Sequence, residues 1–310
     1  MLACVLALVG TTAGNAQPVQ SIAVSHPVEQ NTLVLQMTEV DLSAERLPPL
    51  VVLLGGSDGG LWFGQIGVDL TRAGYSTLSL SYFGHELQSS HLIERPLEPI
   101  ADALAQARRS RNAHNRCIAI IGASKGGELA LLLAAYSGEL SINNTPLADA
   151  YVAASPSHVV WQSPHITLRS RSSWSIAGEP LDFVPHPWLS RHLPDVFFDR
   201  WRVGRYLQDA LQNERAVSRA MIPVENITQP TLMLAGELDE MWPSADMVRA
   251  ANARLERRAP TAPVSADIRQ LNHFVLSDED ARATAITFIS ETLSASIAGG
   301  QCDADLPQGP

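Results

Sequence analysis

The sequence has few cysteines and few charged residues for its length. Its 310 residues include three cysteines, Cys4, Cys117 and Cys302, which are far apart and form no C-x-x-C pair. This spacing excludes the usual zinc and dithiol motifs, and an oxidising compartment would permit but not require pairing of Cys117 with Cys302. Charged residues make up 17% and hydrophobic residues 45% of the chain. Such a balance excludes a disordered protein and allows a full hydrophobic core.

Basic clusters and long apolar spans are also missing. No group of Lys or Arg repeats along a face, and the formal net charge is −10, so nucleic acid is not expected as a partner. Residues 55–60 are glycine-rich but do not match G-x-x-x-x-G-K-[ST], which argues against a nucleotide loop. Beyond the N-terminus no stretch reaches 18 apolar residues, and no membrane span is predicted. No motif implies a metal or an organic cofactor.

The two ends of the chain differ from the rest. Residues 1–16, MLACVLALVGTTAGNA, form an apolar run followed by small residues. This resembles a secretory signal cleaved near Ala16 and predicts export to the periplasm or medium, although the usual basic n-region is missing. Read instead as a strand or a frayed tail, the run predicts a cytoplasmic protein. Residues 299–310 are predicted to be a disordered tail, which leaves residues 17–298 as one folded domain.

Short apolar runs alternate with longer amphipathic ones, a pattern typical of an α/β fold with a mostly parallel sheet and helices on both faces. The runs VVLL, IAII and TLML are apolar throughout, as parallel strands buried on both faces must be. Strands are predicted at Thr32–Val40, Leu50–Leu54, Ser76–Tyr82, Ile118–Ile121, Ala150–Ala154, Thr231–Ala235 and Asp267–Leu271. Helices are predicted at Trp62–Ala73, Leu97–Arg109, Lys125–Tyr136, Val203–Ala216, Ser244–Glu256 and Glu279–Ser294.

An aromatic insertion interrupts this alternation. About 75 residues separate the strand that ends near Ala154 from the one that begins at Thr231, far more than a strand-to-helix crossover needs. The segment, about 157–225, is rich in Trp, Phe and Pro and predicts a cap. Because it leaves the carboxyl edge of the sheet, we expect Trp161, Trp174 and Trp188 to line a substrate pocket. The alternative is an extra packing layer with no role in ligand binding.

The most informative motif is Gly122-Ala-Ser-Lys-Gly126. An apolar strand runs directly into it and a strong helix-forming segment runs out, which is the setting of a nucleophile elbow. The tight turn would lift the hydroxyl of Ser124 clear of the sheet, and the amide of Lys125 at the helix N-terminus could donate to an oxyanion. The alternative is that Ser124 only caps the helix, but a cap does not need flanking glycines.

A serine nucleophile needs a base and an acid that orients it. Among nine histidines, His273 follows the last predicted strand and precedes the last helix, where this class of fold delivers its base. Asp239 follows the preceding strand and a turn at Gly236; Glu237 and Glu240 are its rivals, expected to be solvated. The order Ser, Asp, His is that of α/β-hydrolases.

A second oxyanion donor is expected in Gly55-Gly-Ser-Asp-Gly-Gly60, directly after a strand. The loop can present bare amides, and the amide of Ser57, or of an adjacent residue, is the predicted donor.

Several strings resemble one family, the C-terminal catalytic domain shared by acyl-CoA thioester hydrolases and bile acid-CoA:amino acid N-acyltransferases. They are Gly55–Gly60, Gly122-Ala-Ser-Lys-Gly-Gly-Glu-Leu-Ala130, Ser155-Pro-Ser-His-Val-Val-Trp161 and Gly236-Glu-Leu-Asp-Glu-Met-Trp-Pro243. The resemblance spans about residues 50–290 and implies an α/β-hydrolase with Ser124, Asp239 and His273 as its triad. The separate N-terminal domain of longer members has no room here, and the amino-acid-conjugating members carry Cys where this chain has Ser124.

These observations predict a serine hydrolase that cleaves a small-molecule acyl thioester or ester through an acyl-enzyme. The resemblance favours an acyl-CoA thioesterase-like activity. Three alternatives stay open: a secreted carboxylesterase or peptidase of the same fold, an acyl-CoA:amino acid N-acyltransferase, and a non-catalytic binder. Export would separate the enzyme from intracellular CoA. The oligomeric state is not predicted.

Overall fold

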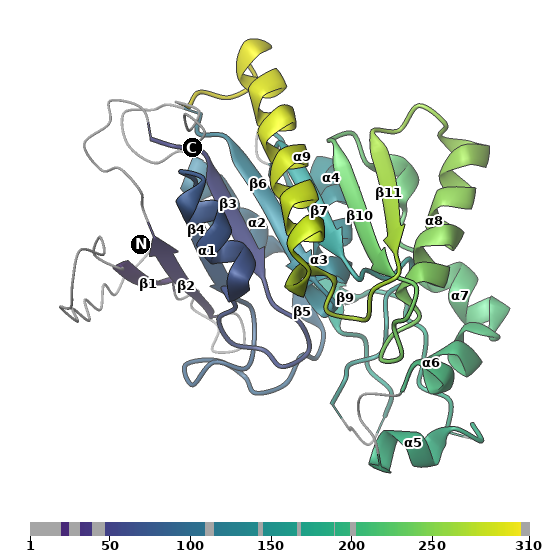
Figure 1. The fold of residues 1–310 in the computed structure, drawn as a ribbon. Coiled ribbons are helices and arrows are strands. Elements are labelled where there is room, and N and C mark those ends of the chain that lie inside the picture. Colours follow the sequence, from purple (N-terminus) through teal and green to yellow (C-terminus); the bar gives the residue numbers. More distant parts are fainter. Residues whose placement is uncertain are drawn as a thin grey trace.

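A mostly parallel sheet with helices on both faces forms the centre of the computed structural model (Figure 1). The structure describes residues 20–24, 32–38, 47–108, 115–141, 145–165, 169–188, 190–198 and 203–304. The proposed signal segment, residues 1–16, lies outside them.

The large sheet has eight strands in the order β1-β2-β4-β3-β6-β7-β10-β11. Only the pairings β1–β2 and β2–β4 are antiparallel, and all others in this sheet are parallel. Its strands are β1 (Gln20–Val24), β2 (Leu33–Thr38), β3 (Leu50–Leu54), β4 (Ser76–Ser81), β6 (Ile118–Ala123), β7 (Ala150–Ala154), β10 (Thr231–Gly236) and β11 (Val264–Arg269). Because β6 is flanked by β3 and β7, its carboxyl end lies near the middle of one sheet edge.

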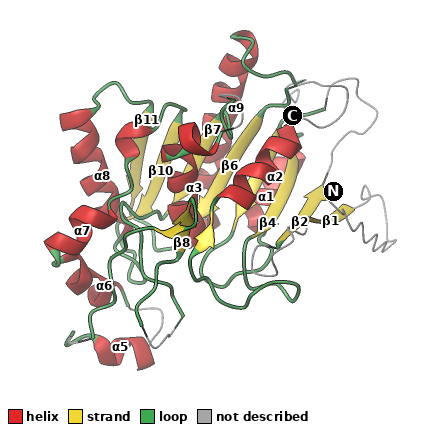
Figure 2. Ribbon diagram, turned by 180° about the vertical axis from the view of Figure 1, so that it is seen from behind, coloured by secondary structure: helices red, strands yellow, loops and turns green. Residues whose placement is uncertain are grey.

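Helices cover the sheet on both sides, as the views from opposite directions show (Figures 1 and 2). The main helices are α1 (Gly64–Arg72), α2 (Glu98–Arg108), α3 (Lys125–Ala135), α4 (Ser137–Leu140), α8 (Ser244–Arg258) and α9 (Glu279–Ala298). Alternate residues of β3 enter different cores: Val52 packs in the cluster that contains α2, α3 and α8, and Val51 packs with α1 and α9. This alternation explains why both faces of a central strand must be apolar.

The insertion between β7 and β10 is folded and lies beyond the carboxyl ends of the strands (Figure 1). It contains β8 (Trp174–Ile176), β9 (Glu179–Pro180), α5 (Leu193–Phe198), α6 (Gly204–Leu211), α7 (Glu214–Ala220) and the 3-10 helix η2 (Val224–Asn226). Strands β8 and β9 join β5 (Arg95–Pro96) in a three-stranded sheet. The insertion is therefore attached to the chain that leads into α2.

Two predicted elements differ from the structure. The helix expected at Val203–Ala216 is two helices, α6 and α7, because Asn213 ends the first run and caps the second, its side chain accepting a hydrogen bond from the amide of Ala216 at 3.1 Å. The last strand begins at Val264, three residues before the predicted start.

The first part of the expected disordered tail is held in place. Cys302 forms a disulfide with Cys117, which directly precedes β6, and the two cysteines are 5% and 0% exposed. The amide of Asp303 also donates to the carbonyl of Asn115 at 2.7 Å. Residues 302–304 are thus packed at the amino edge of the sheet, and residues 305–310 lie outside the described part.

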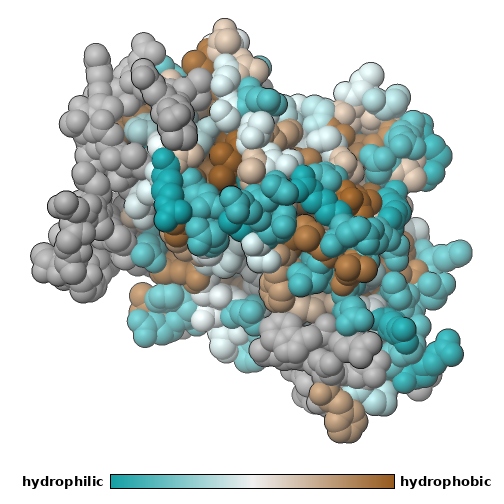
Figure 3. All heavy atoms as spheres, viewed as in Figure 1, coloured by the Kyte–Doolittle hydropathy of each residue, from teal (hydrophilic) through white to brown (hydrophobic). Residues whose placement is uncertain are grey.

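On the face seen in Figure 3, apolar side chains appear as separate patches among polar ones. Within the described residues, no helix has both the length and the apolar character that a bilayer crossing requires.

Candidate active site

Ser124 sits at the turn between β6 and α3. Its backbone angles are φ 57° and ψ −116°, in a region that residues with a side chain rarely occupy. The strain is held in place because the amide of Ser124 donates to the carbonyl of Ala154 on β7 at 2.8 Å, and the carbonyl of Ser124 accepts from Glu128 in the first turn of α3. The side chain is half-buried, so its hydroxyl is reachable from outside.

The flanking glycines are required by close backbone contacts. A Cβ atom on Gly122 would lie 1.9 Å from the carbonyl oxygen of Gly126, and one on Gly126 would lie 2.2 Å from that of Leu54. These distances are far below any van der Waals contact, so strand β6, the first turn of α3 and strand β3 can meet only where side chains are absent. The motif is therefore an elbow in structure as well as in sequence.

Asp239 and His273 are hydrogen-bonded although 34 residues separate them. Nδ1 of His273 lies 2.8 Å from Oδ2 of Asp239, which also accepts from the hydroxyl of Ser244 at 2.7 Å. Oδ1 accepts from the amides of Met241 and Trp242 at 3.1 and 3.0 Å. Each oxygen of Asp239 thus has two donors, which fixes the carboxylate and leaves Nε2 of His273 for another partner.

Two residues that the sequence did not single out as catalytic, Ser155 and Gly236, hold the segment around His273 in place. The hydroxyl of Ser155 donates to the carbonyl of His273 at 2.6 Å. A Cβ atom on Gly236 would lie 2.4 Å from the carbonyl oxygens of both Leu271 and Asn272. Only glycine at the end of β10 therefore lets the segment before His273 approach the strand that leads to Asp239.

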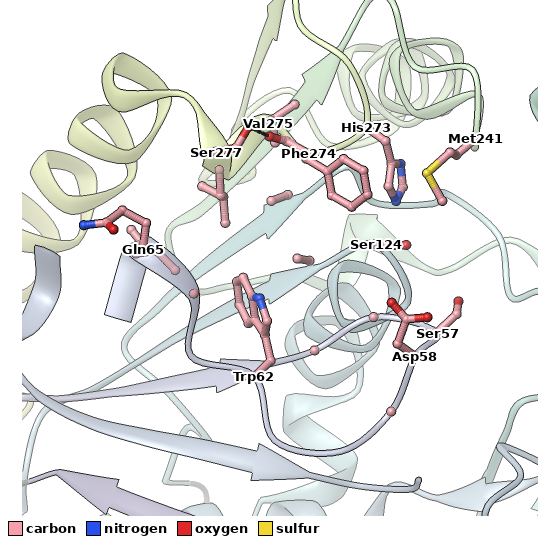
Figure 4. A pocket seen from close by; sticks show the side chains of 18 of the residues that line it. Ser57, Asp58, Trp62, Gln65, Ser124, Met241, His273, Phe274, Val275 and Ser277 are labelled. Atoms are coloured by element: carbon pink, nitrogen blue, oxygen red, sulfur yellow. Dashed lines mark hydrogen bonds between the residues drawn. The ribbon is translucent and has the colours of Figure 1, made fainter. Parts of the chain in front are cut away.

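Ser124 and His273 line one cavity of about 510 Å³. Figure 4 shows Ser124 and His273 at one end of it, Gln65 near the other, and Trp62 and Phe274 between them. The described wall also includes Leu61, Ile66, Met241 and Leu276. Ser124 thus faces a mostly apolar space with a few polar groups, as expected for a small-molecule site.

The glycine-rich loop after β3 lies beside Ser124. A Cβ atom on Gly56 would be 3.6 Å from Oγ of Ser124, and Ser57 lines the same cavity. The amide of Lys125 is the first of α3 and has no partner inside the helix. Both predicted oxyanion donors, Ser57 and Lys125, therefore belong to backbone segments next to Ser124.

The side chain of Lys125, the only lysine in the sequence, points into the protein. Its Nζ lies 2.8 Å from both carboxylate oxygens of Glu128, and the two side chains are 2% and 0% exposed. Burial lowers the pKa of Lys125 and raises the pKa of Glu128, while each partner's charge opposes the shift of the other. Lys125 is thus placed for its backbone amide, not its ammonium group, to face the site.

The tryptophans predicted to bind substrate are placed elsewhere. Trp161 and Trp174 are 1% and 0% exposed, and neither belongs to the residues that line the cavity beside Ser124. Trp161 packs at 5.6 Å from the ring of Trp242, and Trp174 donates from Nε1 to Glu128 at 2.7 Å. Trp188 is 61% exposed. Their contact with a substrate stays a prediction.

One group of side chains has metal-ligating atoms close together in the described part of the chain: Cys117, Asp149 and Cys302, within 4.8 Å of one another. Both sulfurs are used in the disulfide, whereas a metal needs thiolates. The group lies at the opposite end of β6 from Ser124.

A strained serine, a histidine on a fixed aspartate and amides beside the serine can together carry out acyl transfer. Solved structures with the same architecture place the chain in a class. An esterase of Pyrococcus furiosus superposes with a TM-score of 0.56 at 13% identity, over 91% of this chain and 98% of that chain. An acetyl xylan esterase from Paenibacillus sp. R4 gives a TM-score of 0.56 at 14% identity, over 94% and 89%. The chain has the α/β-hydrolase fold.

The family follows from the sequence comparison. Residues 96–264, more than half of the chain, match the model described as BAAT / Acyl-CoA thioester hydrolase C terminal, and the chain belongs to this family. Acyl-coenzyme A thioesterase 6 of Mus musculus is 27% identical over 69% of this chain. The mitochondrial acyl-coenzyme A thioesterase 2 of Rattus norvegicus is 23% identical over 73%. The chain spans about half the length of these relatives, 46% and 45%.

Proposed function

We propose that the protein is a serine hydrolase that cleaves an acyl thioester or ester in two steps. The observation that carries the proposal is that His273, which is paired with the buried carboxylate of Asp239 at 2.8 Å, lines the same cavity as Ser124. The family's thioesterase relatives support a thioester as substrate.

In the first step, Oγ of Ser124 attacks the carbonyl carbon while Nε2 of His273 takes the hydroxyl proton. The amides of Lys125 and Ser57 donate to the oxyanion of the tetrahedral intermediate. Collapse of the intermediate breaks the bond to the leaving thiolate or alkoxide, which receives the proton from His273. Water then attacks the acyl-Ser124 ester with His273 again as base, and the acid is released.

The test uses Ser124→Ala in the full chain. We expect kcat to fall about 1,000-fold or more, because the elbow presents no other nucleophile. The melting temperature should not change. Labelling with a fluorophosphonate followed by peptide mapping is the second measurement. Modification of Ser124 alone supports the proposal, and modification of a different serine with full activity of Ser124→Ala refutes it.

A second candidate, a carboxylesterase acting outside the cytoplasm, is favoured by the buried Cys117–Cys302 disulfide. Disulfides persist in oxidising compartments, and the apolar segment 1–16 fits export. Acyl-CoA is an intracellular metabolite, so an exported enzyme would act on another ester.

One substrate panel separates the two candidates. Rates of hydrolysis are measured for acyl-CoAs, for p-nitrophenyl esters with the same acyl chains and for short peptides. A higher kcat/KM for acyl-CoA than for the matching ester supports the thioesterase. Negligible turnover of acyl-CoA, together with cleavage near Ala16 in the native host, supports the esterase. Amide formation at saturating amine would instead identify a transferase.

A further inference from the structure

A buried tyrosine, Tyr82, is hydrogen-bonded to the glycine-rich loop after β3. Tyr82 directly follows β4 and is 2% exposed. Its hydroxyl donates to the carbonyl of Gly55 at 2.6 Å. Gly55 is two residues before Ser57, so this bond helps to set the plane and the height of the loop whose amide is proposed to face the oxyanion.

The same tyrosine contacts the insertion. The rings of Tyr82 and Trp174 are 5.3 Å apart between centroids. The indole of Trp174 also donates a hydrogen bond from Nε1 to Glu128 at 2.7 Å. Glu128 in turn binds Nζ of Lys125 through both oxygens and accepts from the amide of Trp161 at 3.3 Å.

These contacts form a continuous path from the carbonyl of Gly55 to the residue that follows the nucleophile. Its members Tyr82, Trp174, Glu128 and Lys125 are all buried, and none of the four lines the cavity. A buried ion pair adds little net stability compared with apolar packing, but it restricts the positions of the groups it joins. Here one end fixes the Gly55–Ser57 loop and the other fixes the first turn of α3.

We infer that Tyr82, Trp174 and Glu128 are positioning residues that set the distance between the two halves of the oxyanion hole. The inference rests on the proposed function, because it assigns the oxyanion to the amides of Ser57 and Lys125. The insertion then takes part in catalysis through Trp174, by way of the backbone of the site.

The experiment uses Tyr82→Phe and Trp174→Phe. Each keeps an aromatic ring and removes one donor, the hydroxyl to Gly55 or the indole N–H to Glu128. Glu128 itself is left unchanged, since its removal would leave Lys125 buried without a counter-charge. Tyr151→Phe is the matched control: Tyr151 is fully buried on β7, and its hydroxyl lies near Arg108 and Ser137.

For both variants we expect kcat to fall on the order of 10-fold with KM for a short ester unchanged, since a displacement of about 1 Å in a site can cost roughly 100-fold. The affinity for an alkyl trifluoromethyl ketone, whose adduct with Ser124 carries an oxyanion, should fall by the same factor as kcat/KM. Tyr151→Phe should change neither quantity.

Two outcomes overturn the inference: kcat and ketone affinity within twofold of the parent enzyme, or a lower melting temperature with kcat unchanged at 25 °C. Failure of the proposed function is recognised separately, by full turnover in Ser124→Ala. An inactive Ser124→Ala together with unchanged Tyr82→Phe and Trp174→Phe refutes only the positioning role.

Discussion

The disulfide allows a prediction in which stability and activity separate. Cys117 lies at the amino end of β6 and Ser124 just beyond its carboxyl end, about 20 Å apart along a six-residue strand. Replacing both cysteines, Cys117→Ala with Cys302→Ala, removes the crosslink and frees residues 301–304. We expect a clear loss of stability with kcat at 25 °C unchanged, because the disulfide lies at the opposite end of β6 from Ser124.

The magnitude follows from the length of chain that the bond closes. The two cysteines are 185 residues apart, and the loss of chain entropy in the unfolded state for such a loop corresponds to about 5 kcal/mol. A protein of this size loses roughly 0.6 kcal/mol of stability per degree near its melting temperature. The expected decrease is therefore up to about 8 °C, and about 3 °C if the bond contributes only 2 kcal/mol.

The assay compares melting temperatures with and without a phosphine reductant, in a Cys4→Ala background that excludes crosslinks through Cys4. Because the bond is buried, reduction is carried out in denaturant before refolding. The parent should lose stability on reduction, and the double variant should be insensitive. Equal melting temperatures for oxidised parent, reduced parent and double variant would refute the reasoning, and so would a loss of kcat in proportion to the loss of stability.

Two further predictions concern pH and acyl-chain length. Burial lowers the pKa of His158 and of His186 to about 4. Below pH 6.5 the unfolded state therefore binds protons that the folded state does not. The free energy of unfolding should fall as the pH decreases from 6.5 to 4, by up to roughly 3 kcal/mol for each histidine. Urea unfolding across this range checks it, and His158→Gln should show a shallower dependence; a stability that rises toward pH 4 contradicts it. Phe274→Ala should raise KM about 10-fold for long acyl chains and little for acetyl substrates, since a ring contact is worth about 1–3 kcal/mol. In the control variant Trp161→Phe, the dependence of KM on chain length should be unchanged. Equal effects of Phe274→Ala on KM at all chain lengths would exclude a contact between this ring and the acyl chain.

The sequence was sufficient to predict the sheet because the signals for its strands are local. Leu50–Leu54 and Ala150–Ala154 have the predicted bounds. Each is a short apolar run between turns, so the residues that can be buried in the core are defined by the sequence itself. The antiparallel strand β1 and the small sheet of β5, β8 and β9 were not predicted. Strands of two or three residues have no period of their own and depend on partners far along the chain.

The placement of Ser124, Asp239 and His273 at one edge of the sheet was predictable for a similar reason. In this fold each follows a specified strand, so the order of elements places the carboxyl ends of the parallel strands β6, β10 and β11 at the same edge of the sheet, with β7 between β6 and β10. The pairing of Cys117 with Cys302 was not predictable, because the position of residues after α9 depends on how the last helix packs. Ser155 belongs to one of the strings that resemble the family, but its contact could not be predicted, because it is a hydrogen bond to a backbone carbonyl 118 residues away.

The placement of the aromatic residues shows where an argument from sheet edges stops. The insertion does leave the carboxyl edge that carries Ser124, but that edge has two sides. The cavity is bounded by the segments that lead into α1 and α9, which cover one face, while Trp174 packs in the core shared with α2, α3 and α8 on the other. Which side a connection takes depends on packing against helices that a strand pattern does not specify. Trp62 and Phe274, each next to a glycine-rich or catalytic motif, are therefore better candidates for acyl-chain contacts than the richer set of aromatics in the insertion.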